Sequence, residues 1–195
     1  MKQSPKLPAK TRRAQLIKAA SEVIARKGYA GATTEAIARR AGLTKGALYF
    51  HFGSKEDIFF AVVKSLSERH FEIITQPLRN EPIPIKALEK MICAAIELVE
   101  HKKYFNLEFW QQANKVRRVS VFLDQQHREI EAELAAFLKK HYGLKKKDGQ
   151  SLYILLHILF DGIVVRQECC QRSVDLTRLK KDVLKMTKLY LMGRQ

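Results

Sequence analysis

The sequence has few of the residues that mark secreted or membrane-spanning proteins. Its three cysteines, Cys93, Cys169 and Cys170, are too few for a disulfide framework and are typical of a reducing cytosol. The adjacent residues Cys169 and Cys170 would point in different directions on a helix, which disfavours a disulfide between them and so a redox switch. The longest apolar stretch, residues 152–165, is too short to cross a bilayer. The charged first 13 residues lack the apolar core of a signal peptide, so we expect a soluble cytoplasmic protein.

Motifs that carry enzyme chemistry are also missing. The six histidines are scattered, without the spacing of a zinc site or a paired-cysteine motif. No nucleophile elbow, phosphate-binding loop or dinucleotide fingerprint occurs. We therefore expect no metal, no cofactor and no catalytic residue, and interpret the chain as a protein other than an enzyme.

Positive charge is what the sequence has in excess. The formal net charge is +16, and residues 1–55 contain 12 Lys and Arg against only two acids, Glu22 and Glu35. The remaining 140 residues carry only +6. This asymmetry indicates a binding head for a polyanion, either nucleic acid or an anionic membrane surface, joined to a larger body.

Periodicity predicts an all-α fold. Apolar residues recur at spacings of three and four, and alternating strand patterns are absent. We expect a small basic domain over residues 1–55 and a larger helical domain over residues 56–195, connected by a helix at 55–75 that Pro77 terminates. About nine helices are predicted: 10–27, 33–41, 44–50, 55–75, 85–101, 104–114, 119–141, 149–170 and 175–192.

Residues 33–55 predict a helix-turn-helix. Thr33 and Thr44 are suitable N-caps for two short helices, and Gly42 is suited to the turn between them. Ile37, Ala38, Leu43 and Leu48 would form the small core of this motif. The side chains then left for DNA are Thr44, Lys45, Gly46, Ala47, Tyr49 and His51. The pattern alone also fits an ordinary helical hairpin.

The run from Ala41 to Glu56, AGLTKGALYFHFGSKE, resembles the signature of the TetR family of bacterial transcriptional regulators. The upstream pairs Gly28-Tyr29 and Thr33-Thr34 fit the same pattern, as does Ile37-Ala38. The resemblance covers about residues 10–60. It implies a three-helix DNA-binding domain followed by a larger domain for ligand sensing and dimerisation.

The resemblance also implies roles for single residues. Thr34, Tyr49, His51 and Lys55 match positions that contact DNA phosphates. Thr44, Lys45, Gly46 and Ala47 match the start of the recognition helix, where Lys45 could donate to a guanine. Phe50 and Phe52 are expected to pack against the first and fourth helices. The basic arm leaves two alternatives, contact with the DNA backbone or minor groove and simple solvation, for Lys6, Lys10, Arg12 and Arg13.

The C-terminal region predicts a homodimer. Residues 151–165 are apolar nearly all round, so a helix there must be covered on both sides. A second apolar stripe follows from residue 176, and TetR-like proteins dimerise through two such helices. Gly162 could allow a close helix crossing. The predicted interface residues are Leu152, Leu156, Leu159, Ile163, Leu176, Leu179, Val183, Met186 and Tyr190. Such a dimer would read the two half-sites of a palindromic operator.

The effector pocket has the weakest pattern. Phe105, Phe109, Trp110 and His157 could line an apolar site for an unknown small molecule. Our hypothesis is a one-component repressor that the ligand releases from DNA. The alternatives are a regulator without an inducer, a helical ligand-binding protein that does not read DNA, and an enzyme.

Overall fold

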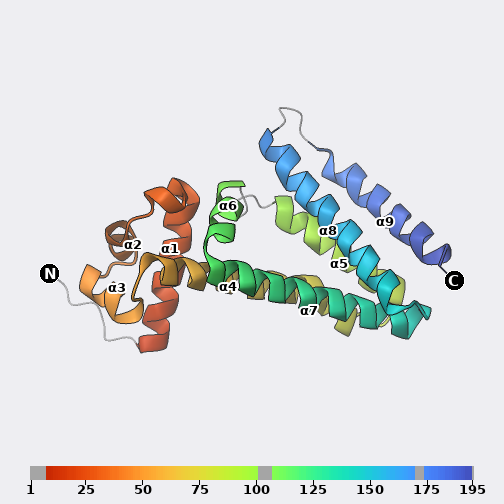
Figure 1. Ribbon diagram of the computed structural model, residues 1–195, viewed down its shortest axis with the longest axis horizontal. Coiled ribbons are helices and arrows are strands. Elements are labelled where there is room, and N and C mark those ends of the chain that lie inside the picture. The colour runs from red at the N-terminus through yellow and green to blue at the C-terminus, as the bar shows by residue number, and fades with distance from the viewer. Residues whose placement is uncertain (1–7, 101–106, 170–173, 195) are drawn as a thin grey trace. The chain divides into compact units, whose positions relative to one another are not determined.

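The computed structural model describes residues 8–100, 107–169 and 174–194, and all regular structure in these ranges is α-helix (Figure 1). The predicted all-α class is therefore confirmed. The described helices are α1 (Ala9–Gly31), α2 (Thr34–Arg40), α3 (Lys45–His51), α4 (Lys55–Asn80), α5 (Pro84–Glu100), α6 (Leu107–Lys115), α7 (Arg117–Tyr142), α8 (Lys146–Cys169) and α9 (Leu176–Met192).

Two helices run past the residues that were expected to end them. In α1 the backbone kinks at Gly28, which has a φ of 68°, and then continues to Gly31. Glycine takes this left-handed conformation without the steric penalty of a Cβ atom, so α1 bends at Gly28 instead of ending there. The prediction that Pro77 ends α4 is wrong, since the helix includes Pro77 and extends to Asn80.

Side-chain contacts explain how α4 accommodates its proline. Thr75 donates its hydroxyl hydrogen to the carbonyl oxygen of Phe71 (2.8 Å), and Arg79 donates to the Thr75 hydroxyl oxygen (2.9 Å). Arg79 also forms ion pairs with Glu72 and with Glu133 on α7. These contacts hold the last turn in place although proline cannot donate a backbone hydrogen bond.

The chain divides into two compact units. Unit 1 comprises residues 1–66 and 108–120, and unit 2 comprises residues 67–107 and 121–195. The first division between the units falls inside α4, after residue 66. Most of α6 belongs to the unit that contains the helix-turn-helix.

Unit 1 is organised around aromatic and aliphatic side chains from α1 to α4. Phe59 is buried, and its ring centroid lies 4.7 Å from that of Tyr29 and 5.4 Å from that of Phe109 on α6. Ring pairs at these distances are favourable beyond the apolar area that they bury. The fully buried large side chains of the unit are Leu16, Ile37, Leu48, Ile58, Phe59, Val62 and Val63.

Unit 2 is a helical bundle in which α5 packs against both α8 and α9. Its fully buried large side chains include Leu88, Ile92, Ile96, Leu134 and Leu138. Helices α7 and α8 approach closely where Gly149 faces Ala135. A Cβ atom added at Gly149 would lie only 2.7 Å from the Cα of Ala135, so this crossing requires glycine.

Candidate nucleic-acid interface

Local hydrogen bonds define α2, α3 and the turn between them. Thr33 and Thr44 cap the two helices, because their hydroxyl oxygens accept from the backbone N–H of Ala36 (3.1 Å) and Ala47 (3.2 Å). Gly42 has a φ of 66°, and the Leu43 N–H donates to the Ala38 carbonyl (2.9 Å). The latter bond and the one from Gly42 to Arg39 form a Schellman motif. The predicted caps and turn are all present.

Long-range contacts fix this pair of helices on α1. The Gln15 side-chain amide donates to the backbone carbonyl of Ala41 at 2.7 Å. Arg40 forms an ion pair with Glu22. Together they tie the end of α2 to α1, so that the orientation of α3 follows from the rest of unit 1.

The start of α3 presents a small, exposed surface. Thr44, Lys45 and Gly46 are exposed, and Ala47 is half-buried. A Cβ atom at Gly46 would meet only the Thr44 hydroxyl, at 3.9 Å, so the backbone here is open to close approach. Another molecule could therefore come within contact distance of the first turn of α3.

Lys45 is already paired in the free protein. Its ammonium forms an ion pair with Glu35 on α2. The hydrogen bond between these groups lowers the pKa of Glu35 and raises the pKa of Lys45. Any anion that takes Lys45 must displace this carboxylate.

The residues matched to phosphate contacts differ in exposure. Tyr49 is 46% exposed, whereas Thr34 is only 9% exposed, with its hydroxyl donating to Glu35 and lying 3.5 Å from the Tyr49 hydroxyl. Lys55 donates to the Ala30 carbonyl (3.2 Å) and lies over the Tyr29 ring. His51 is half-buried at the end of α3. Tyr49 is therefore the most accessible of the four.

The prediction that both Phe50 and Phe52 pack inward is half wrong. Phe52 is 3% exposed and lies under the guanidinium of Arg13, 4.9 Å from ring centroid to Cζ. Phe50 is 82% exposed, with its edge against His51. The helical period places Phe50 on the outer side of α3, next to Tyr49, so it joins the exposed surface from which it was excluded on sequence alone.

The basic arm is only partly described. Lys6 lies outside the described residues, and Lys10 is exposed at the start of α1. Arg12 donates to the side chain of Gln15 (3.1 Å), while Arg13 stacks on Phe52. Two of the four arm residues therefore have contacts within unit 1.

Of the four residues expected to line a pocket, Phe109 and His157 have side chains that the structure describes. Phe109 packs against Phe59 in the core of unit 1, and His157 lies in unit 2. Phe105 and the side chain of Trp110 lie outside the described residues. Phe109 has its role in the unit 1 core because the chain returns to that unit after residue 107.

His157 belongs to a group of rings that was not predicted from the sequence. Its ring lies 4.4 Å from that of His127 on α7 and 5.6 Å from that of Tyr153, one turn earlier on α8. Burial, and then the neighbouring His157, lower the pKa of His127. The Tyr153 hydroxyl is buried and has no hydrogen-bond partner among the described residues. In the sequence, only the four-residue spacing between Tyr153 and His157 could have indicated this group.

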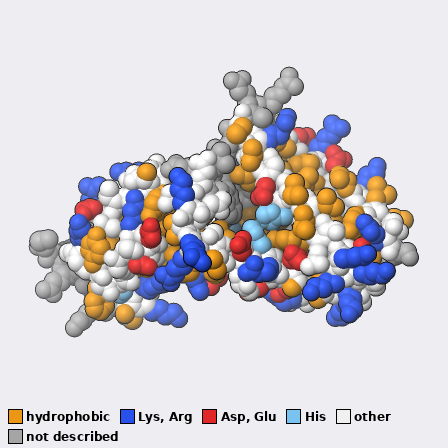
Figure 2. Space-filling model, viewed as in Figure 1, with side chains coloured by type: hydrophobic (Ala, Val, Ile, Leu, Met, Phe, Trp, Pro, Cys, Tyr) orange, Lys and Arg blue, Asp and Glu red, His pale blue; other side chains and the backbone are white. Residues whose placement is uncertain are grey.

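The predicted dimer residues fall mostly on the inner side of α8 and α9. Leu152, Leu156, Ile163 and Val183 are at most 7% exposed within the unit 2 core, and Leu159, Leu176, Leu179 and Tyr190 are half-buried. Only Met186 is exposed. A stretch that is apolar nearly all round has no period by which to tell the inner side from the outer. The exposed apolar side chains on these helices are Ile154, Leu155, Ile158, Val165, Met186, Leu189 and Met192. Figure 2 shows hydrophobic side chains gathered on the surface of this unit.

By length and composition, residues 146–167 of α8 could also cross a membrane, and 28% of the most apolar stretch is buried. No group of three or more His, Cys, Asp or Glu side chains suited to a metal occurs in the described ranges.

Comparison with known proteins matches residues 16–62 to the family described as bacterial regulatory proteins, tetR family. The regulator TtgR of Pseudomonas putida is 28% identical over 184 residues, which cover 86% of this chain and 85% of that protein. The transcriptional repressor BepR of Brucella suis is 42% identical over 91 residues, or 46% of this chain and 43% of BepR.

Solved structures share the fold over nearly the whole chain. A transcriptional regulator from Rhodococcus sp. RHA1 superposes with a TM-score of 0.76, covering 93% of this chain and 96% of that one at 19% identity. The fatty acid degradation regulator FadR of Bacillus halodurans gives a TM-score of 0.69 at 22% identity and covers 99% of this chain and 98% of its own.

Proposed function

Because this chain belongs to the TetR family of transcriptional regulators, we propose that it acts in the cytoplasm as a homodimeric repressor. In this proposal it binds a palindromic operator and releases it when a small molecule binds unit 2. Operator binding, dimerisation and ligand release are separate steps, and each has its own structural support.

The observation that carries the DNA-binding step is the capped start of α3 with its exposed surface. Unit 1 holds 16 Lys and Arg against five Asp and Glu, so its field attracts phosphates. We assign base contacts to Thr44, Lys45, Gly46 and Ala47, and backbone contacts to Thr34, Tyr49, His51 and Lys55. Phe50 adds an apolar surface next to them. A helix of this length enters the major groove with its first turn toward the base edges.

The exposed apolar side of α8 and α9 supports dimerisation. Leu155 and Ile158 are 56% and 63% exposed on α8, beside Gly162, around which a Cβ atom would meet nothing within 4 Å. Exposed apolar patches of this kind mark protein or membrane contacts. A second copy of α8 and α9 would cover the patch and place two α3 helices on one duplex.

The ring group of Tyr153, His157 and His127 supports ligand sensing. A buried hydroxyl without a partner costs about 1–3 kcal/mol, which a ligand group could recover. Of the pocket residues expected from sequence, His157 alone is retained in this proposal. A ligand that binds here changes DNA affinity only if it prefers one of two conformations.

Selection of bound DNA from a random pool tests the DNA-binding step. We expect a palindrome, with K45A relaxing the base preference and Y49A weakening all sequences to a similar degree. K181Q, an exposed lysine of unit 2, serves as the control. Binding without any sequence preference would instead favour a helical ligand-binding protein that does not read DNA.

Analytical ultracentrifugation of I158D tests the dimer, with K185Q as the control. A charge inside an apolar interface should convert the dimer to monomer. An unchanged mass would place the interface elsewhere.

A ligand screen on the selected operator complex tests ligand release. If the operator stays bound throughout the screen, the chain is a regulator without an inducer.

A further inference from the structure

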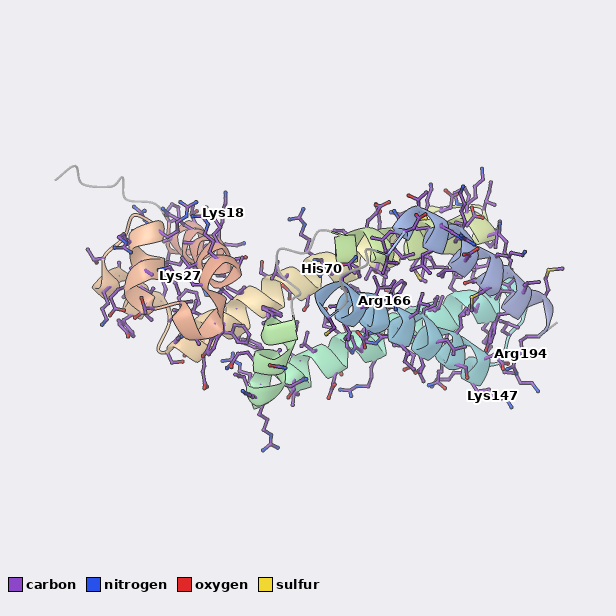
Figure 3. The ribbon with its side chains drawn as sticks, turned by 90° about the horizontal axis from the view of Figure 1, so that it is seen from above. Lys18, Lys27, His70, Lys147, Arg166 and Arg194 are labelled. Atoms are coloured by element: carbon purple, nitrogen blue, oxygen red, sulfur yellow. The ribbon has the colours of Figure 1, made fainter. Side chains whose placement is uncertain are left out.

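The turn between α7 and α8 in unit 2 carries a dense positive patch that the proposed function does not use. We call it the basic turn. All of its basic side chains are exposed. They are Lys139, Lys140, His141, Lys145, Lys146 and Lys147. Figure 3 labels Lys147 and Arg194 at the same end of this unit, and Arg194 forms an ion pair with Asp148, the residue after Lys147 (3.1 Å).

The basic turn accounts for the whole charge excess of unit 2. This unit contains 20 Lys and Arg against 15 Asp and Glu, an excess of five. The basic turn contains five lysines within nine residues, 139–147. The rest of unit 2 has no net charge, and the excess positive charge of the unit equals that of these five lysines.

These lysines are not engaged by acidic neighbours. Elsewhere in unit 2, Lys90, Lys180 and Lys188 form ion pairs with Glu81, Glu97 and Glu89. In the described part of the chain none of the five lysines of the basic turn forms such a pair. Asp148, which directly follows Lys147, forms an ion pair with Arg194 instead. Five ammonium groups are thus left facing solvent.

Helix electrostatics explains only part of the patch. Lys139 and Lys140 lie in the last turn of α7, where a cation stabilises the helix dipole. Lys145, Lys146 and Lys147 flank the start of α8, where a cation is unfavourable. The helix dipole therefore disfavours these three cations, and an external anion would offset that cost.

We propose that the basic turn is a second, sequence-independent contact for the phosphate backbone of duplex DNA, separate from the helix-turn-helix. Lysine is a compact, hydrated point charge suited to phosphates rather than to base reading. The apolar residues of the turn are withdrawn, with Leu144 3% exposed and Tyr142 half-buried. The turn therefore lacks aromatic platforms for single strands and apolar groups for insertion into a membrane.

The test uses the full chain and a duplex without an operator. The variant K145Q/K146Q/K147Q is compared with K86Q/K181Q/K185Q, which removes three exposed lysines from other places in unit 2. Both are placed in a K45A/Y49A background, so that contacts from α3 are weakened equally. Circular dichroism checks that each variant folds. The measured quantity is the slope of log K against log salt concentration.

The three substitutions in the basic turn should reduce the slope by up to about 2.7, because each phosphate contact contributes about 0.9. They should also weaken binding at low salt by about tenfold, whereas the control should change it little. Equal slopes for the two variants would overturn the proposal. So would unchanged duplex binding combined with loss of binding to phosphatidylglycerol vesicles, which would identify a membrane contact. Because this duplex contains no operator, the result does not depend on whether the protein recognises one. The selection experiment above tests operator recognition separately.

Discussion

Lys45 on α3 and Glu35 on α2 form an ion pair across the helix-turn-helix, both from the first turn of their helices. The residue that we propose to read a base is therefore paired with a carboxylate in the free protein. Glu35 acts as an internal competitor for the phosphate or base that Lys45 would contact. Its removal gives a direct test of the interface.

The substitution E35Q should tighten binding to any duplex by about fivefold at low salt, since it frees Lys45 and removes a negative charge near phosphates. Fluorescence anisotropy with operator and non-operator duplexes measures both affinities. E97Q is the control, because Glu97 also pairs with a lysine, Lys180, but in unit 2. Weaker binding by E35Q would show that the carboxylate orients Lys45 instead of competing for it.

Stability should fall as the pH is lowered from 7 to 4. Burial, and then the charge of Arg69, lower the pKa of His70 on α4 (Figure 3) from 6.5 to about 4. The neutral form is favoured in the folded state, so its contribution is present above the unfolded pKa and is lost as the pH falls toward 4. The loss amounts to at most about 3 kcal/mol. Urea titrations should show a weaker pH dependence for H70Q than for the exposed control H141Q.

The crossing of α7 and α8 should not tolerate a larger residue at position 149. G149A places a methyl group 2.9 Å from the Cβ of Ala135, and it should lower the free energy of unfolding by about 1–3 kcal/mol. Urea denaturation gives this value. The double variant G149A/A135G should recover part of the loss, and a double variant no more stable than G149A would argue against a direct clash.

Gly162 on α8 should respond in the opposite way. A Cβ atom there meets nothing within 4 Å inside the protomer, so G162A should stabilise the helix by roughly 1 kcal/mol. If the partner helix crosses at this point, the added methyl group should also weaken the dimer. Sedimentation equilibrium at several concentrations separates the two effects, and an unchanged dissociation constant would move the crossing away from Gly162.

The helix-turn-helix could be predicted in detail because its determinants are local. Thr33 and Thr44 cap helices that start at the next residue, and Gly42 takes the left-handed conformation that its position requires. Each of these features depends on a few consecutive residues. The all-helical class followed in the same way from the spacing of apolar residues.

Features that depend on tertiary contacts were not predictable to the same degree. The contact between Phe109 and Phe59 in unit 1 arises because the chain returns to that unit after residue 107, which no local pattern indicates. The inner side of α8 could not be distinguished while both sides were apolar. Pro77 stays inside α4 because Thr75 and Arg79 support the last turn.

The return of residues 108–120 to unit 1 has a consequence for protein engineering. A fragment ending at residue 66 would retain Phe59 but lose the ring of Phe109 that covers it. Unit 1, which contains the helix-turn-helix, therefore cannot be isolated by truncating the chain at a single position. A chimaera that transplants it onto another sensor needs three junctions, inside α4, in the first turn of α6 and inside α7, where helical phase must be preserved.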